Sequence, residues 1–274
     1  RLRCDWSSDV CSSDLMTDNG TDGQTWGEWT VWGNFSSELE SGIFTYGFDG
    51  YRYRFRSVGG DDAGLIENKE DRYDTETRVD LTAPYAVLEL RMDGNVTNIN
   101  YIELEWAVST QNGTPEIITG YDVQYRFNEG NWTTFEEDTL AKWAGFNAMI
   151  DGVYEFRVSV SDLAGNKGVS EISKSITVDT TAPNTRLVEL PEFTDLEQIV
   201  INLTQIEDAV NFTLYYSYVR EGQETSPVIW NVHGNYSMTD VPIQILLLNQ
   251  YHYYFRIIAY DLADNHLDND SYED

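Results

Sequence analysis

Acidic and amide side chains gather at the same point of a phrase that occurs three times in the sequence. The three copies end in Asp61-Asp62-Ala-Gly64, Asp162-Leu-Ala-Gly-Asn166 and Asp261-Leu-Ala-Asp-Asn265. Carboxylate and amide oxygens clustered in a loop can bind Ca²⁺, which takes six to eight oxygen ligands. The third loop is the best candidate for a calcium site, with Asp261, Asp264, Asn265 and Asp268 as its ligands. A turn is the alternative, because Asp and Asn side chains also hydrogen-bond to their own backbone.

Other patterns of reactive side chains are missing from the sequence. The three histidines lack the paired spacing of a zinc site; they are His233, His252 and His266. No Gly-x-Ser-x-Gly nucleophile motif, phosphate-binding glycine loop or dinucleotide fingerprint occurs. Adjacent carboxylates such as Glu136 and Glu137 are expected by chance in so acidic a chain. The sequence therefore predicts a non-enzymatic chain with no catalytic residues. It predicts no cofactor either, with a calcium ion as the one candidate to test.

The repeated phrase predicts a β-strand. In its second copy four apolar residues alternate with polar ones; they are Tyr154, Phe156, Val158 and Val160. A period of two places them on one face, which is typical of a half-buried antiparallel strand. The phenylalanines of the three copies, Phe55, Phe156 and Phe255, are separated by 101 and 99 residues. A fixed period of this length indicates tandem modules.

A second repeated phrase marks the joints between modules. It reads Val-Asp-Leu-Thr-Ala-Pro over 79–84 and Val-Asp-Thr-Thr-Ala-Pro over 178–183. Short joints that contain proline are stiff. We therefore expect a partial β-sandwich module over 16–80, a complete module over 81–179, and a module over 180–274 that lacks its last strand. These three ranges are called the first, second and third repeats below.

The first fifteen residues fit none of these patterns. Residues 1–15 read like a translated sequencing adaptor, so we expect a non-native or disordered leader that stands outside the fold. A natural disordered leader is the alternative. The only cysteines, Cys4 and Cys11, lie in this segment. The repeats themselves therefore offer neither a disulfide framework nor a thiolate metal site.

The charge of the chain excludes one large class of partners. Asp and Glu number 47 against 17 Lys and Arg, which gives a formal net charge of −30. So acidic a chain repels phosphate backbones, and nucleic-acid binding is not expected. A saline habitat and dispersed calcium binding both remain explanations. Frequent Asn-x-Ser/Thr triplets, at Asn34, Asn95 and Asn131 among others, suit either a glycosylated exterior protein or Asn-rich turns and strands.

Turn dipeptides and short apolar stretches surround the repeated strand in the second repeat. Seven short strands within about 100 residues, without a helical period, predict an antiparallel β-sandwich. The phrase Tyr154 to Asn166, followed by Val-Asp-Thr-Thr-Ala-Pro, resembles the fibronectin type III and related Ig-like repeats of archaeal and bacterial surface or secreted proteins. Residues 121–127 with Trp132 are similar to that family's third strand and the tryptophan after it. The resemblance implies an all-β fold of tandem antiparallel β-sandwiches and names no ligand.

Three residue types recur in step with the strand and suggest structural roles. Tyr53, Tyr154 and Tyr253 open its three copies and are candidates for a tyrosine corner, in which the hydroxyl bonds to nearby backbone. Arg56, Arg157 and Arg256 lie on its polar face, and Trp29, Trp132 and Trp230 precede the repeated phenylalanines by 26, 24 and 25 residues. We expect each arginine to stack on the tryptophan of its own repeat.

These features favour a non-catalytic spacer or adhesion region of a larger protein, located outside the cell or in the cell envelope. Its partners would be other domains of the same polypeptide, with surface proteins or glycans as further candidates, and no membrane span is expected. A carbohydrate- or protein-binding module is the alternative, because an exposed aromatic row could stack on sugar rings. The candidate aromatics are Trp26, Trp29, Trp32 and Phe35 in the first repeat and Tyr215, Tyr216 and Tyr218 in the third. An accessory region of a secreted hydrolase is a third interpretation.

Overall fold

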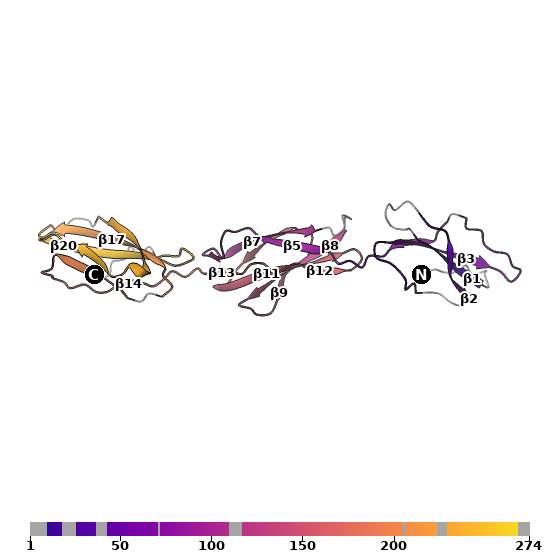
Figure 1. The fold of residues 1–274 in the computed structure, drawn as a ribbon, viewed down its shortest axis with the longest axis horizontal. Helices are drawn as coiled ribbons and strands as arrows, with labels where there is room; N and C mark the ends of the chain where they lie inside the picture. The colour runs from indigo at the N-terminus through magenta and orange to yellow at the C-terminus, as the bar shows by residue number, and fades with distance from the viewer. Residues whose placement is uncertain are drawn as a thin grey trace. The chain divides into compact units, whose positions relative to one another are not determined.

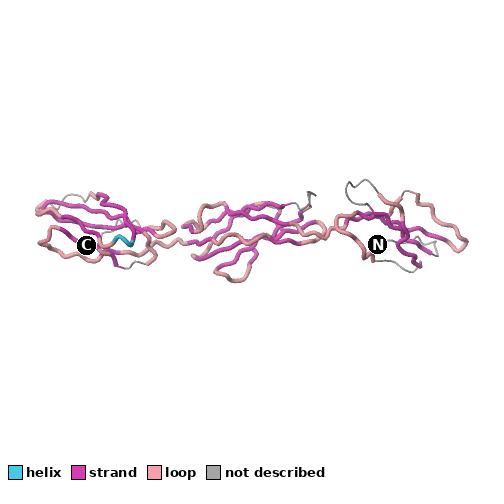
Figure 2. Tube along the Cα trace, viewed as in Figure 1, coloured by secondary structure: helices cyan, strands magenta, loops and turns pink. Residues whose placement is uncertain are grey.

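The computed structural model describes residues 10–17, 26–36, 43–70, 72–109, 117–204, 207–223 and 229–267. Apart from one 3-10 helix, η2 (Met238–Asp240), the regular structure in these residues consists of β-strands (Figures 1 and 2). The strand pairs of the first and third repeats are antiparallel, and in the second repeat three pairs are antiparallel and one short pair is parallel. The prediction of an all-β fold built from tandem antiparallel β-sandwiches is confirmed.

The first repeat forms a four-stranded sheet in the order β2-β1-β3-β4. Its strands are β1 (Val10–Thr17), β2 (Thr30–Ser36), β3 (Arg52–Gly60) and β4 (Thr75–Arg78). The exclusion of residues 1–15 from the fold is wrong for 10–15, which form most of β1 and pair with both β2 and β3. Asp14 is buried there and forms an ion pair with Arg56. The adaptor origin of the segment stays a prediction.

The second repeat contains two sheets, with strand orders β10-β7-β5 and β6-β13-β11-β8-β9, and β12 also pairs with β11. The strands are β5 (Tyr85–Leu90), β6 (Val96–Thr97), β7 (Tyr101–Ser109), β8 (Ile118–Phe127), β9 (Thr133–Thr139), β10 (Trp143–Asn147), β11 (Gly152–Asp162), β12 (Lys167–Val169) and β13 (Ile176–Val178). Phe146 on β10 packs edge-to-face against Phe156 on β11, with ring centroids 5.2 Å apart. The aromatic rings therefore join the two sheets into one core.

The third repeat contains three small sheets, ordered β14-β16, β15-β19 and β18-β17-β20. The strands are β14 (Arg186–Leu187), β15 (Gln198–Ile201), β16 (Leu203–Thr204), β17 (Asn211–Arg220), β18 (Asn231–Ser237), β19 (Ile243–Leu246) and β20 (Tyr251–Tyr260). Their inward side chains form one apolar core of Ile201, Phe212, Leu214, Ile243, Ile245 and Ala259.

Long-range packing divides the chain into two compact units. The first comprises Arg1–Ala86, Val108–Tyr121 and Ser159–Val169, and the second comprises Val87–Ala107, Asp122–Val158 and Ser170–Asp274. The second repeat contributes to both units, so this division does not follow the repeat boundaries. The predicted boundaries after residues 80 and 179 stay a prediction.

The repeated strand predicted from the sequence supplies the centre of the core. On β11, four residues expected on the inner face are 3% exposed or less: Tyr154, Phe156, Val158 and Val160. We predict that Phe156→Ala lowers the free energy of unfolding by about 3–5 kcal/mol, because it leaves a cavity among packed rings. Urea denaturation followed by tryptophan fluorescence would measure this loss. Leu163→Ala, at a side chain that is 69% exposed, is the control and should change stability little.

Candidate functional site: the linker clasp

Each of the three repeated tyrosines bonds to backbone four or five residues upstream. Tyr154 Oη donates to Ile150 O at 2.7 Å. Tyr53 Oη accepts from the N–H of Phe48, and Tyr253 Oη accepts from the N–H of Leu248, both at 2.8 Å. This is the geometry of a tyrosine corner, in which the hydroxyl ties the start of the strand to the turn before it. Each tyrosine therefore fixes the place where its strand begins.

Each of the three repeated arginines lies over a tryptophan ring of its own repeat. The distances from guanidinium carbon to ring centroid are 4.2 Å for Arg56 over Trp29, 4.2 Å for Arg157 over Trp132 and 4.6 Å for Arg256 over Trp230. All three are within the ~6 Å range of a cation–π interaction. The stack covers the outer face of the repeated strand.

A second contact orients each stacked guanidinium. Arg56 pairs with Asp14 at 2.9 Å, and Arg157 Nε donates to Gln124 Oε1 at 2.7 Å. Arg256 lies over a second ring, that of Tyr215, at 4.8 Å. A guanidinium held in one plane by such a partner loses less rotamer entropy when it stacks. The partner differs between repeats although the stack recurs.

We predict that Arg157→Ala destabilises the second repeat by about 0.5–1 kcal/mol through loss of the stack on Trp132. Arg157→Lys should retain only part of this contribution, because an ammonium group lacks the planar face of a guanidinium. Urea unfolding monitored by tryptophan fluorescence gives both values. Equal stability of the wild type and both variants would contradict a stabilising role.

The loop after the repeated strand is held closed by an aspartate and an asparagine. In the second repeat, Asp162 Oδ1 accepts from the backbone N–H of Asn166 at 2.9 Å, and Asp162 Oδ2 accepts from the Asn166 amide at 2.9 Å. Gly165 provides the left-handed turn, with φ of +91°. Asp162 is only 4% exposed, so these bonds satisfy a carboxylate that would otherwise be costly to bury.

The second hydrogen of the asparagine amide reaches the linker that precedes the repeat. Asn166 Nδ2 donates to Asp80 O at 3.0 Å, and both residues belong to the first unit. The third repeat repeats this bond within the second unit, where Asn265 Nδ2 donates to Asp179 O at 2.7 Å. Both acceptors occupy the same place in the Val-Asp-x-Thr-Ala-Pro phrase. The loop asparagine therefore contacts the linker in both copies.

An aspartate upstream of the repeated strand contacts the same linker from the preceding repeat. Asp49 Oδ1 accepts from the N–H of Leu81 at 2.7 Å, and its Oδ2 accepts from the hydroxyl of Thr82. Asp151 accepts from the N–H of Thr180 at 3.0 Å and from the hydroxyls of Thr180 and Thr181. We call this set the linker clasp: Asp49 and Asn166 on the first linker, and Asp151 and Asn265 on the second.

The linker bonds stabilise the charged form of both aspartates. The Leu81 N–H and then the Thr82 hydroxyl lower the pKa of Asp49. The Thr180 N–H, with the hydroxyls of both threonines, lowers the pKa of Asp151 against an opposing effect of burial. A carboxylate that accepts several hydrogen bonds resists protonation. The clasp is therefore complete at neutral pH.

The first repeat departs from the loop pattern. Leu65 stands at the asparagine position, and its N–H donates to Asp61 Oδ1 at 2.8 Å, but it has no side-chain amide to donate further. Leu65 is 71% exposed, and Asp61 is exposed as well. The turn thus forms without the asparagine, and what the asparagine adds is the contact with the linker.

The predicted calcium ligands lie only partly within the described residues. Asp261 accepts from the backbone and the amide of Asn265, at 2.9 and 2.8 Å, and Asp264 adopts a left-handed φ of +68° in the turn. Asp268 lies outside the described residues. In the part of the chain that the structure describes, no three His, Cys, Asp or Glu side chains are grouped to hold a metal. This geometry is that of a turn, and calcium binding stays a prediction.

The aromatic row of the first repeat is engaged within the repeat. Arg54 lies 3.7 Å from the centroid of the half-buried Trp26, and Trp32 packs edge-to-face on Phe55 at 5.8 Å. In the third repeat, Tyr216 stacks on Tyr218 with centroids 6.1 Å apart. The side chain of Phe35 lies outside the described residues. Trp26, Trp32 and Tyr216 thus contact neighbouring side chains, whereas Tyr218 is 48% exposed.

Sequence reasoning missed the aspartates of the clasp, although a signal for them exists. Asp49-Gly50 and Asp151-Gly152 precede the repeated tyrosine by four and three residues. The spacing alone shows a recurring turn. It does not show that the carboxylate bonds 32 and 29 residues further along the chain, to Leu81 and Thr180.

No protein-family model and no curated protein matches this chain. Among solved structures it resembles the fibronectin(III)-like modules of Clostridium thermocellum CbhA, at 14% identity over 66% of this chain and 88% of that one, with a TM-score of 0.32. It also resembles the chicken CNTN1 FN1-FN3 domains, at 13% identity over 95% of this chain and 86% of that one, with a TM-score of 0.27. The chain has a fibronectin type III/Ig-like β-sandwich fold, as its own strand topology shows. No helix among the described residues is long and apolar enough to cross a membrane.

We predict that the clasp makes stability depend on pH through Asp151. Its lowered pKa means that the carboxylate stabilises the fold fully above the ordinary aspartate value of about 3.9 and loses this effect as pH falls through the lower folded value. Asp151→Asn should therefore be less stable than the wild type at pH 7, and the difference should shrink below about pH 4. Thermal unfolding of both proteins across this range measures it, and a difference that does not change with pH would contradict the assignment.

Proposed function

We propose that this chain is a non-catalytic spacer or adhesion region of a larger extracellular or cell-envelope protein. The observation that carries the proposal is the linker clasp, because its residues recur with the repeats and contact the joints rather than a pocket. Asn166 and Asn265 each direct one amide hydrogen to a linker carbonyl. Side chains that restrain the linker in successive repeats are suited to a spacer, which keeps other parts of a polypeptide apart.

Composition supports the same proposal. A net charge of −30 keeps a chain soluble and disfavours contact with other acidic surfaces. The grouped histidines, nucleophiles and carboxylates of known enzyme motifs do not occur in the sequence. A fibronectin type III/Ig-like fold by itself does not decide function, since one fold carries many. The clasp therefore carries more of the proposal than the fold does.

A spin-label distance measurement tests the spacer proposal. One label is placed at exposed Glu129 and the other at exposed Arg220, on either side of the second linker. We expect a narrow distance distribution in the wild type and a broader one in Asn265→Ala, because the variant loses the bond from Asn265 to Asp179 O. Asn231→Ala is the matched control, since its amide also donates to a backbone carbonyl, that of Ile229 at 3.4 Å, away from the linker.

The two variants separate linker restraint from general destabilisation. Broadening in Asn265→Ala alone supports a spacer whose joints are held by the clasp. Equal distributions in the wild type and both variants, with folding confirmed by circular dichroism, would contradict it. Retention of the chain on a glycan array would favour the binding-module interpretation instead.

A further inference from the structure

The outer face of the sheet β10-β7-β5 carries two exposed aromatic side chains. Trp143 on β10 is 65% exposed, and Tyr101 on β7 is 43% exposed. Their neighbours along each strand, Ala144 and Ile102, are buried, so both rings lie on the solvent side of the sheet. The three strands of this sheet all belong to the second repeat and to the described residues. The face is therefore complete within that repeat.

The register of the two strands brings each ring next to a carboxylate. Trp143 pairs with Glu105, and Gly145 pairs with Glu103. The ring of Tyr101 lies over Gly145, where a Cβ would collide with it. Glu103 thus stands beside the ring of Tyr101, as Glu105 stands beside Trp143. Positions two residues apart on a strand are about 7 Å apart, so the rings form a row with roughly that spacing.

One of these carboxylates is available to a further cation. Arg91 donates its backbone N–H to Glu103 O, but its guanidinium pairs with Glu105 instead, through Oε2. The side chain of Glu103 is exposed, and it forms no ion pair within the described part of the chain. The face therefore presents an aromatic ring, Tyr101, beside an open negative charge.

Elsewhere in the chain, an arginine occupies this kind of place. In three instances an arginine lies over a tryptophan ring and also pairs with a carboxylate: Arg54 with Trp26 and Glu76, Arg56 with Trp29 and Asp14, and Arg126 with Trp132 and Glu155. The distances from guanidinium carbon to ring centroid are 3.7, 4.2 and 5.1 Å. Of the tryptophans in the described ranges, Trp143 alone is exposed. The surroundings of Trp143 and Tyr101 thus match this arrangement except for the guanidinium.

The chain's own cations do not supply that guanidinium. All its arginines and lysines except Arg1 and Arg3 lie in the described residues, and none of those lies over the ring of Trp143 or Tyr101. Toward either end of the sequence a further repeat follows, so a continuation of the chain would have to extend back past that repeat to reach this face. The net charge of −30 attracts basic segments of other polypeptides. These observations favour a cation from a partner.

We propose that this face binds an extended arginine-x-arginine segment of a partner polypeptide. One guanidinium stacks on Trp143, and the other stacks on Tyr101 and pairs with Glu103. In an extended segment, residues two apart point the same way and lie about 7 Å apart, which matches the spacing of the rings. Arginine suits such a place because its planar guanidinium can stack and form an ion pair at once. The spacer function depends on the linkers and stands whether or not this face is used.

The test uses the full chain and the blocked peptide Ser-Arg-Ser-Arg-Ser. The control peptide, Ser-Arg-Arg-Ser-Ser, has the same composition and charge, but its adjacent arginines point to opposite sides when extended. NMR titration follows the backbone amides of β7 and β10 and the indole N–H of Trp143. We expect saturable shifts at these groups. The control peptide should bind roughly two- to fivefold more weakly, the loss of one exposed cation–π contact.

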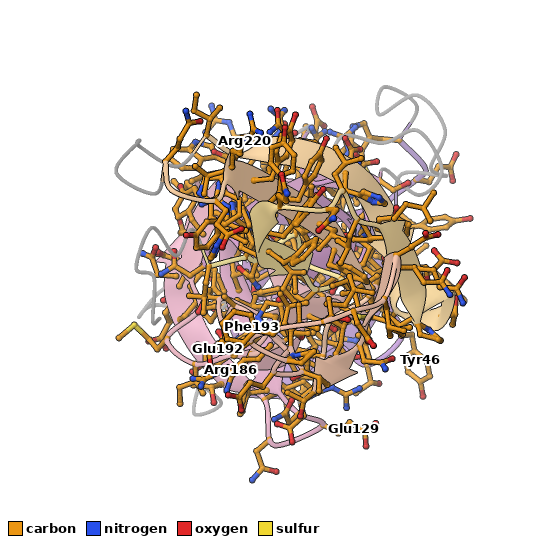
Figure 3. The ribbon with its side chains drawn as sticks, turned by 90° about the vertical axis from the view of Figure 1, so that its left-hand side faces the viewer. Tyr46, Glu129, Arg186, Glu192, Phe193 and Arg220 are labelled. Carbon is orange, nitrogen blue, oxygen red and sulfur yellow. The ribbon has the colours of Figure 1, made fainter. Side chains whose placement is uncertain are left out.

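Three variants of the chain separate the contributions of ring and charge. Trp143→Ala should weaken binding of Ser-Arg-Ser-Arg-Ser roughly two- to fivefold through loss of a cation–π contact. Glu103→Gln should weaken it by up to about fivefold through loss of an exposed ion pair. Glu129→Gln makes the same change of charge at another exposed residue and should leave binding unchanged (Figure 3). All three side chains are exposed, so folding should be retained, which circular dichroism checks.

Four outcomes would overturn the proposal. The first is the absence of saturable shifts on β7 and β10 in a folded chain. The second is equal binding of the two peptides. The third is tighter binding of cellohexaose than of the arginine peptide at the same resonances, which would assign the face to a glycan. The fourth is a shift of these resonances with chain concentration in the absence of peptide, which would assign the face to a second copy of the chain.

Discussion

Burial of one face of the repeated strand is the constraint on which the other features depend. On β11 the side chains of Tyr154, Phe156 and Val158 must point inward, because their apolar area leaves water. Since a strand alternates, Arg157 must then point outward, where it lies on Trp132. The strand ends at Asp162, so the loop that contacts the linker has a fixed starting point. The tyrosine corner, the arginine stack and the asparagine part of the clasp therefore follow from a single register.

Two side chains, an asparagine from one repeat and an aspartate from the other, make the clasp on each linker. An asparagine amide has two hydrogens to donate. Asn166 uses one to close its own loop on Asp162 and the other to reach Asp80 O, so that loop closure positions the donor for the linker. From the other repeat, Asp49 accepts the N–H of Leu81 and the hydroxyl of Thr82. The polar groups of a short linker are thus satisfied by side chains that the neighbouring repeats already hold in place.

Features that depend on a local period could be predicted from the sequence, and features that depend on contacts across the chain could not. Alternation along 154–160 is enough to predict β11 and its buried face. The bond from Asn166 to Asp80 spans 86 residues and involves a backbone carbonyl, which carries no residue-specific signal. The inclusion of Val10–Leu15 in β1 was missed for a different reason. An unusual composition suggested a leader, yet the backbone of this segment pairs with β2 on one side and β3 on the other, and backbone pairing accepts many sequences.

Calcium binding and the clasp would compete for the same groups at the third loop. Asp261 already accepts two hydrogen bonds from Asn265, and the amide of Asn265 donates its other hydrogen to Asp179 O. A cation bound by Asp261 would draw on the same carboxylate oxygens and would favour rotation of the Asn265 amide to present its oxygen. That rotation would remove the donor from the linker. Calcium at this loop would therefore loosen the joint that the asparagine holds, whereas an unoccupied loop keeps the linker bonded.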